Sequence, residues 1–308
     1  MRKKLKNLSE NTLLGRFIFK IPHLLYEFYR NRIMTDEQFI KARFKRELGY
    51  KLNLKSPKTF NEKIQWLKIN DRTAKHTECA DKFTVREYVS KRIGEEHLVP
   101  LLLHTNDVND LIPENLPQTP FIIKATHFCG GNIIVRDKNN VNWKQIREKA
   151  SKWLKENYYY RLREWQYKNI PPALVIEKLL QDNAGKIPYD YKVHCFNGEI
   201  EFIQVHQDRE SNHKKVIYDS NWNLLKFSSH FEEGAAIPEP KTFELMKKIA
   251  RKLSKEFYYV RVDLYEVEDT VYFGELTFHH ASGFRRFTPS SQDRILGDKL
   301  KLPIDEAP

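Results

Sequence analysis

Two hairpins in the C-terminal half constrain the fold of this chain more than any other feature of its sequence. Asn197-Gly198 is the strongest short-range signal for a tight hairpin, and strand-like runs flank it at residues 191–196 and 199–205. A second pair of such runs, at residues 259–267 and 271–278, surrounds another short turn. We therefore expect antiparallel sheet over much of this half of the chain.

Helical periodicity recurs between the strand-like segments. Apolar residues at helical spacing predict helices over residues 80–93, 143–157 and 243–257. Thr59 or Asn61 is expected to cap a further helix. Short apolar runs predict strands at residues 121–124, 133–135 and 174–180. Helices that alternate with antiparallel strands indicate an α+β fold.

The positive charge is concentrated near the N-terminus. The 308 residues carry a formal net charge of +12, and residues 1–55 account for most of it. The nearly neutral remainder argues against a nucleic-acid-binding protein, whose basic surface should lie on the folded body. Residues 10–30 form an amphipathic pattern, which predicts either a helix on an anionic membrane surface or a helix packed on the body.

The spacing of the cysteines and the length of the apolar runs indicate the cellular compartment in which the protein is expected to act. Cys79, Cys129 and Cys195 are widely separated and lack metal-ligand spacing, which is typical of structural thiols in a reducing compartment. No run of about 18 apolar residues is present. We expect a cytoplasmic protein, and the membrane alternative for its N-terminal segment would place residues 1–55 at the inner face of the membrane.

The last hairpin carries two carboxylates that could share a metal ion. Strand side chains alternate between faces, so Arg261 and Asp263 share a face on one strand, and so do Glu275 and Thr277 on the other. Two carboxylates on adjacent strands can converge on Mg²⁺, which prefers oxygen ligands together with phosphates. The alternative is an ordinary solvent-facing sheet surface.

A lysine precedes a glycine turn in the middle of the chain. Lys124 ends an apolar strand, and the turn His127-Phe128-Cys129-Gly130-Gly131-Asn132 follows. A lysine placed there could reach a phosphate that the Gly130-Gly131 backbone approaches closely. The alternative is a hairpin turn beside a surface lysine.

The Asn-Gly hairpin also has a polar, cationic face. Asp190, Lys192 and His194 alternate onto one side, and Arg209 follows the returning strand. Lys192 and Arg209 suit contacts to phosphate or carboxylate, which makes them candidate catalytic residues together with Arg261. A hydrated sheet face is the alternative.

The order of these elements resembles the ATP-grasp superfamily, and more closely the TupA-like ATP-grasp family, which is associated with bacterial surface-polysaccharide synthesis. The resemblance covers about residues 35–303. Its motifs are Pro57-Lys58-Thr59-Phe60-Asn61-Glu62-Lys63-Ile64-Gln65-Trp66-Leu67, Ala80-Asp81-Lys82-Phe83-Thr84-Val85-Arg86, His127-Phe128-Cys129-Gly130-Gly131-Asn132, Tyr218-Asp219-Ser220-Asn221-Trp222-Asn223 and Tyr272-Phe273-Gly274-Glu275-Leu276-Thr277-Phe278.

The resemblance implies an ATP site between two α+β lobes. Lys124 would grip the phosphates, residues His127, Gly130, Gly131 and Asn132 would belong to the loop that closes over them, and Lys192 would contact phosphate. The inter-lobe strand would meet adenine and ribose through Glu177, Lys178 and Leu180.

The resemblance also implies a Mg²⁺ site and a catalytic cation. Asp263 and Glu275 resemble the metal ligands, and Arg261 would hold the acyl-phosphate or the substrate carboxylate. Thr277 stands where most ATP-grasp enzymes have asparagine. A hydroxyl group can still ligate Mg²⁺, directly or through water.

The implied domains are a helical N-terminal region (1–78), a first ATP-grasp lobe (79–178) and a second lobe (179–308). The implied activity is that of an ATP-dependent carboxylate–amine ligase, with a uronic acid of a glycan as the carboxylate and an amino acid as the amine. Two alternatives are a glycosyltransferase of polysaccharide synthesis and a non-catalytic nucleotide-binding module.

Overall fold

The computed structural model describes residues 25, 27–208, 210, 212–228 and 232–305. The chain divides into two units, residues 1–51 and residues 52–308. The basic amphipathic segment at residues 10–30 lies almost entirely outside the described residues, so its predicted membrane contact stays a prediction. Among the described residues, no helix is both long enough and apolar enough to cross a membrane.

The described part of the first unit is helical. It contains a π-helical turn η1 (Tyr29–Ile33) and helix α3 (Asp36–Leu48). Thr35 and Gln38 form a reciprocal capping box at the start of α3, which satisfies two backbone N–H groups that the helix leaves unpaired. Gly49 ends the helix in the left-handed conformation, with φ of 89°.

The second unit begins with helices and ends with a helix. Its helices are α4 (Phe60–Asn70), α5 (Ala74–Ala80), α6 (Val85–Ile93), α7 (Trp143–Leu154), α8 (Tyr159–Leu162), α9 (Phe243–Ser254) and α10 (Ser291–Lys299). Its 3-10 turns are η2 (Glu95–His97), η3 (Val108–Asp110), η4 (Pro113–Asn115), η5 (Trp165–Tyr167), η6 (His280–Gly283) and η7 (Pro303–Asp305). Thr59 caps α4 in a capping box with Glu62, as its sequence predicts. The helix predicted over residues 80–93 begins later than expected, at Val85 of α6, because α5 ends at Ala80 and a turn follows it.

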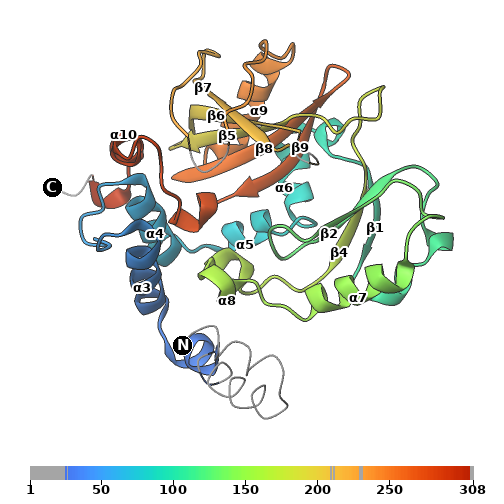
Figure 1. The fold of residues 1–308 in the computed structure, drawn as a ribbon, viewed down its shortest axis with the longest axis horizontal. Coiled ribbons are helices and arrows are strands. Elements are labelled where there is room, and N and C mark those ends of the chain that lie inside the picture. Colours follow the sequence, from blue (N-terminus) through green and yellow to red (C-terminus); the bar gives the residue numbers. More distant parts are fainter. Residues whose placement is uncertain (1–24, 26, 209, 211, 229–231, 306–308) are drawn as a thin grey trace, which may run out of the picture. The chain divides into compact units, whose positions relative to one another are not determined.

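One antiparallel sheet has the strand order β1-β4-β2-β3 (Figure 1). Its strands are β1 (Leu101–Thr105), β2 (Phe121–Ala125), β3 (Asn132–Val135) and β4 (Leu174–Lys178). Phe121 and Ile123 are buried on one face of β2, in the same core cluster as Ile146 and Trp153 of α7. This burial fixes the register of β2, because a shift by one residue would expose its apolar side chains.

The other antiparallel sheet has the strand order β7-β6-β5-β8-β9. Its strands are β5 (Asp190–Phe196), β6 (Glu199–Gln207), β7 (Lys214–Tyr218), β8 (Tyr259–Val267) and β9 (Thr270–Thr277). Asn197 and Gly198 join β5 to β6 with φ of 51° and 87°, the positive values that a tight hairpin turn requires. Both predicted hairpins are therefore present.

The two faces of this second sheet differ in chemistry. One face is apolar and carries Val193, Val262 and Leu276. It belongs to the same core cluster as Met246 and Ile249 of α9. The opposite face carries the polar side chains, and those are buried as well: Asp190, His194 and Gln204 are each 0% exposed, and Lys192 is 6% exposed. The polar face is therefore not the hydrated surface that the sequence left open as an alternative.

Helix α4 covers one end of the polar face. Phe60 stacks on Phe196 of β5 with 5.3 Å between ring centroids, and it meets Tyr259 of β8 edge-on at the same distance. Gln65 of α4 donates hydrogen bonds to the carbonyl oxygens of Ser282 and Gly283 in η6. These contacts hold η6 and the chain after β9 against the polar face.

Candidate active site

The β8–β9 hairpin places two carboxylates opposite each other. Asp263 pairs with Glu275, and Arg261 pairs with Thr277, in the antiparallel register. The register shifts after Asp263, where Gly274 is the extra residue of a β-bulge. A Cβ atom at Gly274 would lie 2.8 Å from the Tyr265 ring, so this close approach requires glycine. All four predicted residues of the hairpin therefore lie together.

Arg261 links the two carboxylates. Its Nε donates to Asp263 Oδ1 at 2.6 Å, and one Nη donates to Asp263 Oδ2 at 2.7 Å and to Glu275 Oε1 at 3.1 Å. Burial acts to lower the pKa of Arg261, but Asp263 and Glu275 outweigh it and raise that pKa well above its usual value. Arg261 is thus a permanent cation beside the carboxylate pair.

Lys192 supplies a second cation from the neighbouring strand. Its Nζ donates a short hydrogen bond to Asp263 and lies 2.8 Å from Asp190 Oδ2. The register of β5 and β8 sets Lys192 directly opposite Asp263. Sequence reasoning predicted both residues as site residues, but only the sheet order shows that they touch.

The oxygen atoms of this hairpin suit one hard cation that is shared with phosphates. Among the residues that the structure describes, no three His, Cys, Asp or Glu side chains are grouped to hold a metal ion. Mg²⁺ is commonly bound by one or two carboxylates plus substrate phosphates, so a closed protein cage is not needed. Thr277 donates its hydroxyl hydrogen to Glu275 Oε1 at 3.3 Å and adds a third oxygen beside the pair. The donor set therefore fits Mg²⁺ with a nucleotide.

The first sheet presents a separate ion-pair cluster. Lys124 of β2 lies 2.7 Å from Glu177 of β4, and Arg86 of α6 lies 3.1 Å from the other oxygen of Glu177. Lys178, the last residue of β4, is exposed, and Leu180, two residues later in the chain, is partly exposed. Lys124 and Glu177 are both predicted site residues, whereas the sequence predicts no role for Arg86.

The glycine turn is exposed at its tip and anchored at its base. Gly130 is exposed with φ of 83°, and Asn132 is exposed at the start of β3. Gly131 is buried, and a Cβ there would lie 2.5 Å from the Phe128 ring. The turn closes through a 2.9 Å hydrogen bond from Ala125 N to Gly131 O.

His127 supports this turn from within the core. Its ring is 1% exposed, and Nε2 donates to Trp153 O at 2.9 Å. Burial lowers the pKa of His127, which keeps the imidazole neutral. Within the predicted loop, His127 is therefore hydrogen-bonded to the C-terminal end of α7 in the core, whereas Gly130 and Asn132 are exposed. Arg209, the remaining predicted residue, lies outside the described residues.

Glu164 is a buried carboxylate that sequence reasoning missed. It lies between α8 and η5 and is 6% exposed. Its pKa is raised to about 7, chiefly by burial and also by the charge of Glu275, against the opposing charges of Lys68 and Arg261. Both Arg261 and Glu275 of the hairpin therefore influence the protonation of Glu164. Nothing in its local sequence signals this position.

Comparisons with known proteins place these features in context. No curated protein is significantly similar to the chain in sequence. Among solved structures, D-alanine–D-alanine ligase from Bacillus anthracis is 18% identical over 65% of this chain and 57% of its own, with a TM-score of 0.40. The ATP-grasp ligase PsnB, complexed with a minimal precursor variant, Mg and ADP, is 11% identical over 78% and 64%, with a TM-score of 0.42.

D-alanine–D-alanine ligase from Helicobacter pylori is 13% identical over 82% of this chain and 68% of its own, with a TM-score of 0.41. The chain thus spans less than two thirds of the length of the first two of these structures. A sequence profile of the family described as TupA-like ATPgrasp matches residues 62–301 and confirms the resemblance seen in the motifs. The chain has an α+β fold with two antiparallel sheets, and it belongs to the TupA-like ATPgrasp family.

Proposed function

We propose that this chain is an ATP-dependent carboxylate–amine ligase. One observation carries the proposal: Asp263 and Glu275 face each other on adjacent strands, and Arg261 contacts both. Carboxylates of this kind suit a metal bound to triphosphate, and a cation beside them suits the anionic groups of phosphoryl transfer. Family membership adds weight, because ATP-grasp proteins as a class bind ATP.

The nucleotide would lie between the proposed lobes, residues 79–178 and 179–308. Lys124 is positioned at a strand end by Glu177, so its ammonium group is already held in one orientation for a phosphate. The outward-facing backbone of Gly130 could approach the same phosphates without steric hindrance. Lys178 and Leu180 would offer backbone groups to adenine, and Glu177 would meet the ribose.

Asp263, Glu275 and Thr277 would hold Mg²⁺ together with the phosphates. When bound, the ion would offset the negative charge of the triphosphate. Arg261 and Lys192 now neutralise Asp263, and they would turn part of their hydrogen bonding to the substrate. Each of these cations is oriented by a fixed carboxylate, so little reorganisation is needed when charge develops during the reaction.

The proposed chemistry has two steps. A carboxylate oxygen of the acceptor attacks the γ-phosphorus, the bond to the ADP oxygen breaks, and an acyl-phosphate forms. An amine nitrogen then attacks the acyl carbon, the bond to phosphate breaks, and the amine proton leaves to solvent. Arg261 and Lys192 would stabilise the charge on the phosphoryl and acyl oxygens throughout.

The proposed substrates are a uronic acid of a bacterial capsule or cell-wall glycan and an amino acid. This part rests on the association of the family with surface-polysaccharide synthesis. The enzyme would act in the cytoplasm, where ATP is supplied, and at the inner face of the membrane if residues 1–55 bind anionic lipid.

Hydroxylamine provides a test that does not require the natural amine to be known. ADP release is measured with a panel of uronic acids, with and without hydroxylamine, which converts an acyl-phosphate into a stable hydroxamate and phosphate. The proposal predicts a hydroxamate that depends on ATP, Mg²⁺ and one of the acids. ATP with Mg²⁺ should also raise the melting temperature, and UDP-sugars should not. A shift with a UDP-sugar and none with ATP would favour a glycosyltransferase instead.

A further inference from the structure

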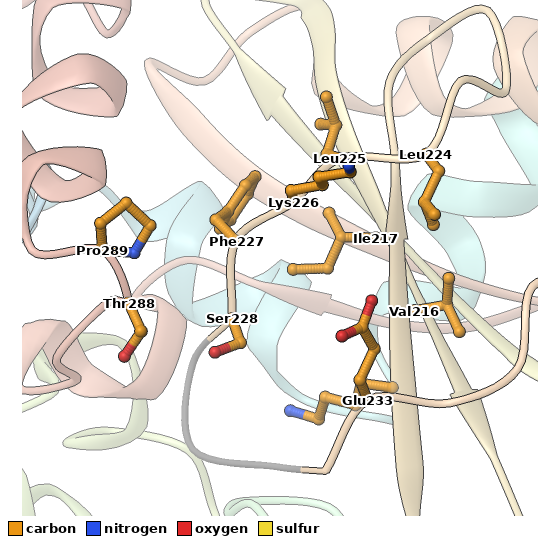
Figure 2. Close-up of a pocket in the computed structure, with 11 residues that line it drawn as sticks. Val216, Ile217, Leu224, Leu225, Lys226, Phe227, Ser228, Glu233, Thr288 and Pro289 are labelled. Carbon is orange, nitrogen blue, oxygen red and sulfur yellow. The ribbon is translucent and has the colours of Figure 1, made fainter.

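A cavity of about 390 Å³ lies on the outer side of β7 (Figure 2). Its walls include the apolar side chains of Ile217, Phe227 and Pro289. Figure 2 shows the carboxylate of Glu233 pointing toward Ile217, with the hydroxyl groups of Ser228 and Thr288 on the other side of the opening. The volume is within the range of small-molecule sites.

The segments that form this cavity are tied together by backbone hydrogen bonds. Ser228 and Thr288 exchange two such bonds, each 2.9 Å long. Lys215 N donates to Glu232 O at 3.1 Å, and Gly234 N donates to Lys215 O at 2.8 Å. These bonds hold the Phe227 and Glu233 segments against the sheet edge, so the cavity is largely preformed.

Lys215 connects the cavity to the candidate active site. It lines the cavity and pairs with His206 of β6, which in turn pairs with Asp190 of β5. Directly paired strand residues share a face, so Lys215 lies on the polar face that also carries Lys192 and Asp263. A ligand in the cavity could therefore reach that face through its Lys215 end.

The charge around Lys215 favours an anion at this end. Burial, together with the cations Arg261, Arg285 and Lys192, lowers the pKa of Lys215 to about 7, and Asp190 acts in the opposite direction. Cations gathered in one partly buried place repel one another, and a bound carboxylate would relieve that repulsion. Arg285 lies on the chain after η6, and its backbone oxygen accepts a 2.8 Å hydrogen bond from Asn61 of α4.

We infer that this cavity binds the acceptor as a carboxylated sugar ring, with Lys215 and Arg285 holding the carboxylate toward Arg261. The inference rests on the proposed ligase function and deepens it by naming the acceptor site. The mixed lining fits a sugar acid, because its ring has an apolar face for Phe227 and Pro289. The hydroxyl groups of the sugar can form hydrogen bonds with the hydroxyl groups of Ser228 and Thr288 and with the carboxylate oxygens of Glu233. Lys215 and Arg285 are thus residues that bind and position the substrate.

The test measures binding of glucuronic and galacturonic acid by ligand-observed NMR, with glucose and galactose as uncharged probes. Five proteins are compared: wild type, Lys215→Gln, Arg285→Gln, Phe227→Ala and the matched control Lys214→Gln. Lys214 is the neighbouring lysine of β7 and does not line the cavity. The substitution Lys214→Gln therefore removes the same charge without changing the cavity wall. Phe227→Ala tests the apolar wall separately. The shift in melting temperature with ATP and Mg²⁺ is recorded for every protein.

Wild type should bind at least one acid and neither uncharged sugar. Lys215→Gln and Arg285→Gln should each weaken that binding by about tenfold, the usual effect of losing a charged hydrogen bond, while Lys214→Gln should match wild type. The ATP-induced shift should be the same in all variants. Phe227→Ala should weaken binding of the acid while its fold remains intact by thermal unfolding.

Three results would overturn the inference: no binding of either acid by wild type, equal binding by Lys215→Gln, or binding of a free amino acid that the same substitutions abolish. In each case an intact ATP-induced shift would leave the proposed function standing. A wild type without any ATP-induced shift would instead contradict the proposed function itself.

Discussion

Asp263 and Glu275 lie directly opposite each other across β8 and β9, yet their surroundings differ sharply. The Asp263 side chain is 1% exposed and contacts both Arg261 and Lys192, whereas the Glu275 side chain is 31% exposed. Removal of the Asp263 charge would leave two buried cations without their main partner. Removal of the Glu275 charge would not.

The first prediction follows from this difference. Asp263→Asn and Glu275→Gln should each reduce turnover by about 10²-fold, because each removes a charge that would help to hold the metal. Asp263→Asn should also lower the free energy of unfolding by about 3 kcal/mol, and Glu275→Gln by less than about 1 kcal/mol. ADP release at saturating Mg²⁺ and urea unfolding measure the two effects.

Glu275→Gln is therefore the cleaner test of the metal assignment. Glu268→Gln is its matched control, because Glu268 is an exposed carboxylate in the turn of the same hairpin. The double variant should lose little more than the worse single variant, since both residues would act on one ion. Near-normal ADP release by Glu275→Gln would show that the carboxylate pair does not hold a required metal.

The second prediction uses the exposed thiol beside the glycine turn. Cys129 is exposed, whereas Cys79 and Cys195 are buried, so a thiol reagent should label Cys129 first in the folded protein. If the Gly130 turn closes over ATP, then ATP should slow this labelling severalfold, and AMP should not. Mass spectrometry measures the rate at each cysteine, and Cys129→Ser identifies the fast phase. Labelling that ATP does not change would argue against closure of this turn.

The third prediction concerns the pH dependence of stability. The pKa of Glu164 is raised to about 7 by burial, so between its unfolded value and pH 7 the folded state holds a proton that the unfolded state has released. Stability must therefore fall as the pH rises through this window. Glu164→Gln mimics the protonated form, so it should flatten the dependence and be more stable than wild type at pH 8.

Urea unfolding at pH 5 and pH 8 in metal-free buffer measures this effect. Glu148→Gln is a suitable control, because Glu148 is an exposed carboxylate on α7 and its removal should leave the pH dependence unchanged. A Glu164→Gln protein with the same pH dependence as wild type would mean that Glu164 is ionised in the fold at low pH.

The fourth prediction tests the packing that supports the site. A Cβ atom at Gly297 of α10 would lie 2.2 Å from Lys58 O and 2.7 Å from Phe60 N, at the start of α4. Gly297→Ala should lower the free energy of unfolding by about 2 kcal/mol, because overpacking outweighs the better helix propensity of alanine. The exposed neighbour substitution Asp298→Ala should have an effect of less than about 0.5 kcal/mol. Equal melting temperatures for the two variants would contradict the close approach of α10 and α4.

Local sequence signals predicted the parts of this fold that depend on local chemistry. Asn197-Gly198 fixes its hairpin because both residues accept positive φ, and Thr59 caps α4 because its hydroxyl and Glu62 satisfy each other's backbone groups. Alternation along β8 and β9 placed Arg261, Asp263 and Glu275 together, since residues on one hairpin are already neighbours.

Features that depend on long-range packing were not visible in the sequence. Strands β1 and β7 and helix α10 were not predicted. The helix predicted over residues 80–93 was placed too early, because α6 begins at Val85. The burial of Asp190 and Lys192 depends on α4 and on the chain after β9, which are far away in sequence. Glu164 and Lys215 gain their positions in the same way, so no local pattern marks them.

The central claim is that a carboxylate is activated by transfer of the γ-phosphoryl group. The most direct measurement uses a sugar acid whose carboxylate carries ¹⁸O, together with ATP, Mg²⁺ and hydroxylamine or the amine. Attack of the carboxylate on phosphorus predicts that each phosphate released with product carries one ¹⁸O atom from the acid, and that the nucleotide product is ADP. Product formation with unlabelled phosphate, or with AMP and pyrophosphate, would contradict the acyl-phosphate mechanism.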